Sequence, residues 1–161
     1  MRTIDSLLSE YAESHQKKLN IAIHYICVPL IFFSLIGLLA AIPMSNSITN
    51  ALPVSVLPYA HFGTVVIVLG LIYYFRLSTV LFIGMLIFSA IVLFLINLIA
   101  SLNFAPLWLI MLVIFVVAWI GQFIGHNHEG KKPSFIKDLQ FLMIGPAWTM
   151  SHLFDALGVK Y

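Results

Sequence analysis

Histidine is the side chain of this sequence with the widest chemical repertoire, and the chain has six of them. Imidazole titrates near neutral pH and is the commonest metal ligand in proteins. Five of the six lie towards the two ends of the chain: His15, His24, His126, His128 and His152. The sixth, His61, stands apart from the others, and we interpret it as a hydrogen-bonded anchor.

The spacing of the first two histidines restricts how they could share a metal ion. His15 and His24 are about half a turn out of phase if they lie on one straight helix. They can meet at one ion only if the chain bends between them, and we expect that bend near Lys17–Asn20. Asn20 lies one turn before His24 on the same helix face, and a hydrogen bond from it could fix the orientation of the ring.

The next candidate group is His126 with Glu129. It follows Gly121 and Gly125, two small residues whose spacing permits two membrane helices to approach closely. His126 and Glu129 are one turn apart and share a face if the helix continues to Glu129. Two or more histidines with a carboxylate are the ligands expected of a non-haem iron(II) site with open positions. Glu129 could be a ligand, a hydrogen-bond acceptor behind the ligands, or a base. Together with Asn20 it is a candidate catalytic residue.

The histidines belong to a chain with the composition of an integral membrane protein. Of its 161 residues, 61% are hydrophobic and 9% are charged, against about 45–50% and about 25% in soluble domains. The single cysteine, Cys27, excludes an internal disulfide. A formal net charge of +2 provides no extended surface for binding nucleic acid. We therefore expect a single all-α, membrane-embedded domain over residues 1–161, in contact with membrane lipids.

Four apolar segments meet or nearly meet the roughly 20 residues that a helix needs to cross a bilayer. They are Ile21–Ile42, Tyr59–Phe75, Leu77–Ala100 and Pro106–Gly125. Lys and Arg lie before the first segment, between the second and third, and after the fourth, whereas the two opposite loops have none. The positive-inside rule then places both termini in the cytoplasm, at the inner membrane of a bacterium or the endoplasmic reticulum of a eukaryote.

Both ends of the chain are predicted to lie at the membrane surface. Apolar residues recur at helical spacing from Ile4, which predicts an N-terminal amphipathic helix. Leu139–Phe154 is apolar but short, and Gly145-Pro146 interrupts it, so we expect two short interfacial or re-entrant helices. Lys131 and Lys132 can serve as cytoplasmic anchors or bind an anionic lipid head group or a fatty-acid carboxylate.

The order and spacing of these residues resemble those of the membrane 2-hydroxy-fatty-acid dioxygenase family (Mpo-like), once described only as a domain of unknown function. The matching positions are Tyr11-x3-His15-x4-Asn20-x3-His24, Val28-Pro29, Gln122-Phe-Ile-Gly-His126, Glu129-x3-Pro133, Leu139-Gln140 and Pro146. The resemblance covers nearly the whole chain. It implies an iron(II)-dependent membrane enzyme that uses O2 to shorten a 2-hydroxy fatty acid by one carbon.

The resemblance also implies ligands for the Fe(2+) cofactor. The family's histidines correspond to His15, His24 and His126. His152 stands where fungal members have a glutamate, and imidazole can replace a carboxylate as a ligand, so His152 is a fourth expected metal ligand. His128 and Glu129 are the other side chains that could complete the metal shell. The stretch between His126 and Glu129 is one residue shorter than in fungal members.

Two other functions are compatible with the sequence. A haem-b electron carrier would use histidines of facing helices as axial ligands, and a non-enzymatic transporter or scaffold would use histidines as anchors. Axial ligands are expected at matching depths on two spans, and transporters usually place polar groups near the bilayer midplane. In this chain the histidines gather at one interface on three segments, which favours a metal-dependent enzyme.

Overall fold

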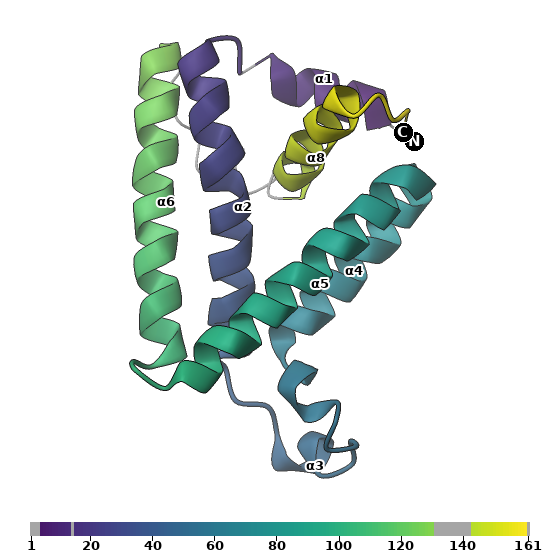
Figure 1. The fold of residues 1–161 in the computed structure, drawn as a ribbon, viewed down its shortest axis with the longest axis vertical. Coiled ribbons are helices and arrows are strands. Elements are labelled where there is room, and N and C mark those ends of the chain that lie inside the picture. The colour runs from purple at the N-terminus through teal and green to yellow at the C-terminus, as the bar shows by residue number, and fades with distance from the viewer. Residues whose placement is uncertain (1–3, 14, 131–142, 161) are drawn as a thin grey trace.

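The computed structural model of the chain describes residues 4–13, 15–130 and 143–160. All regular elements in these residues are helices (Figure 1). They are α1 (Ile4–Ala12), α2 (Lys18–Ala40), α3 (Asn46–Thr49), the 3-10 helix η1 (Leu57–Tyr59), α4 (Phe62–Leu77), α5 (Thr79–Leu102), α6 (Leu107–Glu129) and α8 (Ile144–Ala156). The predicted all-α fold is confirmed.

Among the described residues, three helices are long and apolar enough to cross a membrane: α2, α5 and α6, with 23, 24 and 23 residues. α4 is also apolar but has only 16 residues, or about 24 Å at about 1.5 Å per residue. It begins at Phe62 rather than at Tyr59, because Leu57–Tyr59 forms a separate 3-10 helix with a proline in its first turn. The described fold therefore has three candidate spans and one shorter apolar helix.

α2 and α6 lie side by side, run in opposite directions, and form the most extensive helix pair of the structure (Figure 1). Glycines allow the close approach. A Cβ atom on Gly121 would lie 2.6 Å from Sγ of Cys27, and one on Gly125 would overlap Oδ1 of Asn20. The predicted role of the two glycines is thus confirmed.

α4 and α5 form an antiparallel hairpin that crosses α2 obliquely (Figure 1). The chain turns at Ser78, whose hydroxyl oxygen accepts a hydrogen bond from the Leu81 N–H at 3.2 Å and so caps α5. The hairpin packs on α2 through a buried apolar cluster: Phe32, Phe33, Ile36, Ile67, Val92, Ile96 and Met111. This packing holds α2 in place between α6 and the hairpin.

α1 and α8 lie against each other near the end of the molecule where α2 begins and α6 ends (Figure 1). Their contact is apolar and contains the buried residues Ile4, Leu8, Tyr11, Ile144, Ala147 and Trp148. The predicted N-terminal amphipathic helix is present, and α8 covers part of its apolar face. The two short helices therefore lie beside α2, where α8 also contacts α5.

Gly145-Pro146, expected from the sequence to divide the apolar segment Leu139–Phe154, lies at the start of a helix. Both residues lie in the first turn of α8, which runs unbroken from Ile144 to Ala156. Proline is tolerated there because the N–H groups of the first turn have no partner within the helix. Residues 139–142, the first part of the predicted pair of helices, lie outside the described residues.

Candidate metal centre

Three buried histidines meet at the end of the α2–α6 pair, beside α1 and α8. His15 lies between α1 and α2, His24 in the second turn of α2, and His126 in the last turn of α6. Their exposed fractions are 5%, 1% and 5%. One ligand nitrogen from each can be chosen so that the three atoms lie within 4.8 Å of one another. Buried imidazole nitrogens at this separation could hold one metal ion.

A bend in the chain brings the first two histidines together. α1 ends at Ala12 and α2 begins at Lys18, and between them Lys17 has an extended backbone with φ −82° and ψ 133°. As a result the ring centroids of His15 and His24 lie 4.1 Å apart. The predicted bend is present, but it lies before α2 begins at Lys18 and so meets the predicted range Lys17–Asn20 only at Lys17.

Backbone carbonyls orient two of the three rings. Nδ1 of His15 lies 2.7 Å from the carbonyl oxygen of Tyr11, and Nδ1 of His24 lies 2.8 Å from that of Asn20. A carbonyl oxygen can only accept a hydrogen bond, so each Nδ1 carries the proton and each Nε2 carries the lone pair. This is the usual way in which proteins set the tautomer and orientation of metal-binding imidazoles. Asn20 thus orients His24 through its backbone carbonyl.

Glu129 connects the end of α6 to the start of α2. Its Oε1 accepts a hydrogen bond from the backbone N–H of Gln16 at 3.2 Å, and its Oε2 accepts from the backbone N–H of Lys17 and from Nδ2 of Asn20, both at 3.0 Å. The Lys17 ammonium also donates to the carbonyl of His128 at 2.5 Å. No side chain of α2 caps its own first turn. Glu129 therefore acts as a cap supplied by another helix.

Two aromatic side chains cover the histidine cluster. The ring of Tyr11 stacks on His15 at 4.3 Å with an interplanar angle of 13°, and the ring of Trp148 lies 5.4 Å from His15. Both aromatic residues are buried. Neither is predicted as a site residue by the sequence analysis. Tyr11 could have been found, since it lies one turn before His15, but no spacing in the sequence points to Trp148.

His152 lies on α8 outside the cluster of converging nitrogens. Its ring packs against Trp148 at 4.2 Å and Tyr25 at 5.5 Å, and its Nδ1 lies 2.9 Å from the carbonyl oxygen of Trp148. Trp148 therefore contacts His152 on α8 as well as His15. The structure brings together three of the four predicted metal ligands.

The other two histidines lie away from the converging nitrogens. His128 is exposed at the end of α6. His61 caps α4 by accepting a hydrogen bond on Nδ1 from the Thr64 N–H at 3.2 Å. Burial lowers the pKa of His61, which favours the neutral ring that this hydrogen bond requires. Lys131 and Lys132 lie outside the described residues.

Comparison with known protein families identifies the family of this chain. Residues 1–157 match the family described as 2-hydroxy-palmitic acid dioxygenase Mpo1-like. The chain belongs to the Mpo1-like family. The resemblance inferred from the motifs is thereby confirmed. No curated protein and no solved structure matches the chain.

The histidine cluster of this Mpo1-like chain fits a metal ion. Its donors are buried imidazoles, and two of them are held in the tautomer that presents Nε2. Imidazole binds iron, zinc, copper and nickel, so the donor set could hold a metal ion but does not select which metal. The family name suggests that the chain is a dioxygenase of a 2-hydroxy fatty acid.

Proposed function

We propose that the chain is an Fe(II)-dependent dioxygenase that shortens 2-hydroxy fatty acids by one carbon at the cytoplasmic face of the membrane. The observation that carries the proposal is the buried cluster of His15, His24 and His126 in a member of the Mpo1-like family. An iron(II) ion held by these histidines would supply the redox chemistry that a reaction with O2 requires.

The proposed reaction balances without a further reductant. One 2-hydroxy acid and one O2 give the acid shorter by one carbon, together with CO2 and water. The bond between the carboxyl carbon and the hydroxyl-bearing carbon breaks, the latter becomes the new carboxyl carbon, and O2 accepts the four electrons. This balance agrees with the lack of a dinucleotide-binding fingerprint in the sequence.

The described residues have different roles at the proposed site. His15, His24 and His126 would hold the ion and would leave part of its coordination shell to other groups. Tyr11 and Trp148 cover His15 and keep bulk water from the cluster. We assign Asn20 and Glu129 as positioning residues, because Asn20 contacts both His24 and Glu129 through hydrogen bonds.

The ring geometry favours one shared ion over a haem. The three ring centroids lie 4.1 Å, 4.9 Å and 5.4 Å apart, and the rings meet edge to face. Axial haem ligands lie on opposite faces of the macrocycle, which separates them. A transporter or scaffold that uses its histidines only as anchors gives no reason for three of them to converge in a buried place.

Iron content and product formation test the proposal together. Protein purified without chelator should hold about one iron per chain. In air it should convert 2-hydroxypalmitate to the acid one carbon shorter and leave palmitate, which lacks the 2-hydroxyl, unchanged. His24→Ala and His126→Ala should lose both the iron and the activity while remaining folded. Removal of O2 should stop turnover without releasing iron.

Two further variants serve as controls. His128→Ala should keep iron and activity, because His128 is exposed on the same helix as His126. His152→Ala should keep the iron, because His152 lies outside the converging group. Stoichiometric iron in both His24→Ala and His126→Ala would remove these residues from the ligand set. Iron-loaded, folded protein that shortens no 2-hydroxy acid of any chain length would refute the enzymatic proposal.

A further inference from the structure

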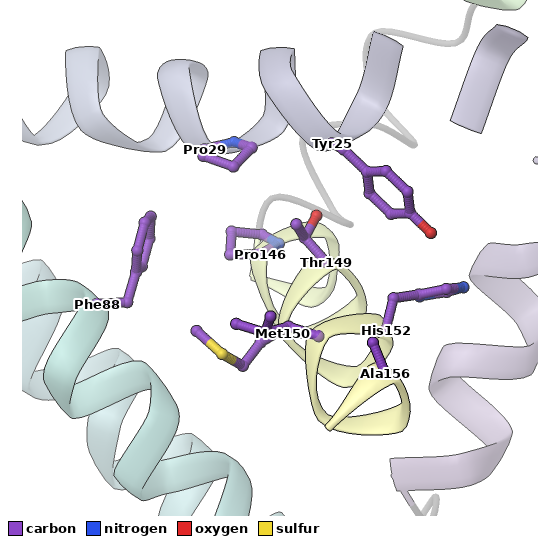
Figure 2. A pocket seen from close by; sticks show the side chains of 9 residues that line it. Tyr25, Pro29, Phe88, Pro146, Thr149, Met150, His152 and Ala156 are labelled. Carbon is purple, nitrogen blue, oxygen red and sulfur yellow. The ribbon is translucent and has the colours of Figure 1, made fainter. Parts of the chain in front are cut away.

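A cavity of about 510 Å³ lies between α2, α5 and α8 (Figure 2). Ligand pockets in proteins commonly have volumes of roughly 300–1,000 Å³. α2 contributes Tyr25 and Pro29, α5 contributes Phe88, and α8 contributes the remaining wall, including His152. The cavity is thus large enough for a small molecule. Two of the helices that line it, α2 and α8, also carry residues at or beside the histidine cluster.

The cavity has one polar end and one apolar end. The Tyr25 hydroxyl and the imidazole of His152 lie towards the same side of the cavity, whereas Pro29 and Phe88 lie at the opposite side (Figure 2). The hydroxyl of Thr149, on the wall between, donates to the carbonyl of Gly145 at 3.1 Å. The groups placed to bind a polar head are therefore concentrated at one end, and the rest of the cavity suits a hydrocarbon.

The polar end adjoins the candidate metal centre. Tyr25 directly follows His24 in α2. The ring of Trp148 lies 4.2 Å from that of His152, 5.7 Å from that of Tyr25 and 5.4 Å from that of His15. One indole ring thus neighbours both the polar end of the cavity and the histidine cluster.

We propose that this cavity is the binding site for the alkyl chain of a long-chain 2-hydroxy acid, with the head group at Tyr25 and His152 and the tail at Phe88. The inference rests on the proposed function, which supplies the substrate class. The Tyr25 hydroxyl can donate to a carboxylate. His152 donates from Nδ1 to the carbonyl of Trp148 and so presents Nε2 as an acceptor for a hydroxyl.

A single-chain hydroxy acid fits this lining better than a membrane phospholipid. A phosphate head group is normally held by Arg or Lys, and none of the described residues that line the cavity is either. A 2-hydroxy acid offers a hydroxyl donor and a carboxylate acceptor, which match His152 and Tyr25. Each methylene buried along the apolar wall should strengthen binding about fourfold.

Photo-crosslinking on the full chain tests the site independently of turnover. The probe is 2-hydroxypalmitate with a diazirine on its terminal carbon, added to the protein in detergent or nanodiscs. We expect the label on the peptides that contain Pro29 or Phe88, and excess unlabelled 2-hydroxypalmitate should abolish it. Label that is spread over the lipid-facing sides of the helices, or that only phospholipid displaces, would overturn the inference.

Variants of the cavity wall add a second readout. Phe88→Ala enlarges the apolar end and should raise the affinity for acids longer by one or two methylenes, by about fourfold for each. Thr149→Phe should fill the cavity and abolish the competed label. The matched control is Phe94→Ala on the same helix, where the side chain is 62% exposed and no shift is expected. An equal shift in Phe88→Ala and Phe94→Ala would contradict the assignment.

The outcome separates this inference from the proposed function. Competed labelling of the cavity without any product from 2-hydroxy acids would support the binding site and contradict the dioxygenase. Product formation with competed label elsewhere in the chain would support the dioxygenase and overturn the cavity as its alkyl-chain site.

Discussion

At the scale of single residues, the candidate site depends on side chains that hold the histidines as much as on the histidines themselves. Asn20 is fully buried, with its backbone carbonyl at Nδ1 of His24 and its side-chain amide at Glu129. Glu129 in turn accepts from two backbone N–H groups next to His15. One carboxylate on α6 therefore fixes the place where the chain bends between His15 and His24.

Replacement of Glu129 tests this positioning role. Glu129→Ala removes the acceptor of three hydrogen bonds at the start of α2, and we expect the free energy of unfolding to fall by about 1–2 kcal/mol. Iron affinity should fall by about 10–100-fold, as when groups behind metal ligands are removed. Chelator competition and denaturant unfolding measure the two effects. Complete loss of iron with unchanged stability would instead make Glu129 a ligand.

At the scale of secondary-structure elements, the α2–α6 pair is the frame of the site because it carries His24 and His126. The distance between the two helices is set by the glycines at positions 121 and 125, where a larger side chain would overlap α2. The segment between α1 and α2 adds His15, and the short helix α8 adds Trp148. The site is therefore built on packed helices rather than on loops alone.

A methyl group at position 125 should disturb this frame. The new Cβ of Gly125→Ala would overlap Oδ1 of Asn20, whose amide is held by Glu129. We expect a loss of about 1–3 kcal/mol of stability from overpacking, together with weaker iron binding. Ile124→Ala is the control, because Ile124 is 56% exposed and contributes little to helix packing. Unchanged stability and iron content in Gly125→Ala would show that the helices can separate freely.

At the scale of the whole molecule, the described chain has two chemically different ends. α1, α8 and the histidine cluster lie towards one end, and α3 lies at the other (Figure 1). Between them the helices expose large apolar side chains, and only 22% of the most apolar window of α6 is buried within the protein. Such a surface is suited to contact with lipid.

Reporter tags test the orientation proposed from the charges. Tags at either terminus should report the cytoplasm, and a tag inserted at Asn46, next to α3, should report the opposite side. The physical reason is the concentration of Lys and Arg near the termini and at Arg76. Protease protection in sealed vesicles gives a second measurement. A terminus found on the side opposite to the cytoplasm would contradict the proposed cytoplasmic location of the site.

Several features of this protein could be predicted from its sequence because they depend on neighbouring residues alone. Hydropathy predicts the apolar helices, because a bilayer requires continuous apolar length. The spacing of Gly121 and Gly125 indicates a close helix contact, and the half-turn offset between His15 and His24 requires a bend. The family motifs point to the three histidines that the structure brings together.

Other features were decided only by the tertiary structure. Glu129 accepts from the backbone N–H of Gln16, 113 residues away in sequence, and helical periodicity cannot predict which distant segment will meet it. The same holds for Trp148 beside His15, for His152 outside the cluster, and for the cavity that ends at Phe88. These contacts depend on the crossing angles and packed volumes of helices from distant parts of the chain. They arise only when side chains on all of these helices pack at once.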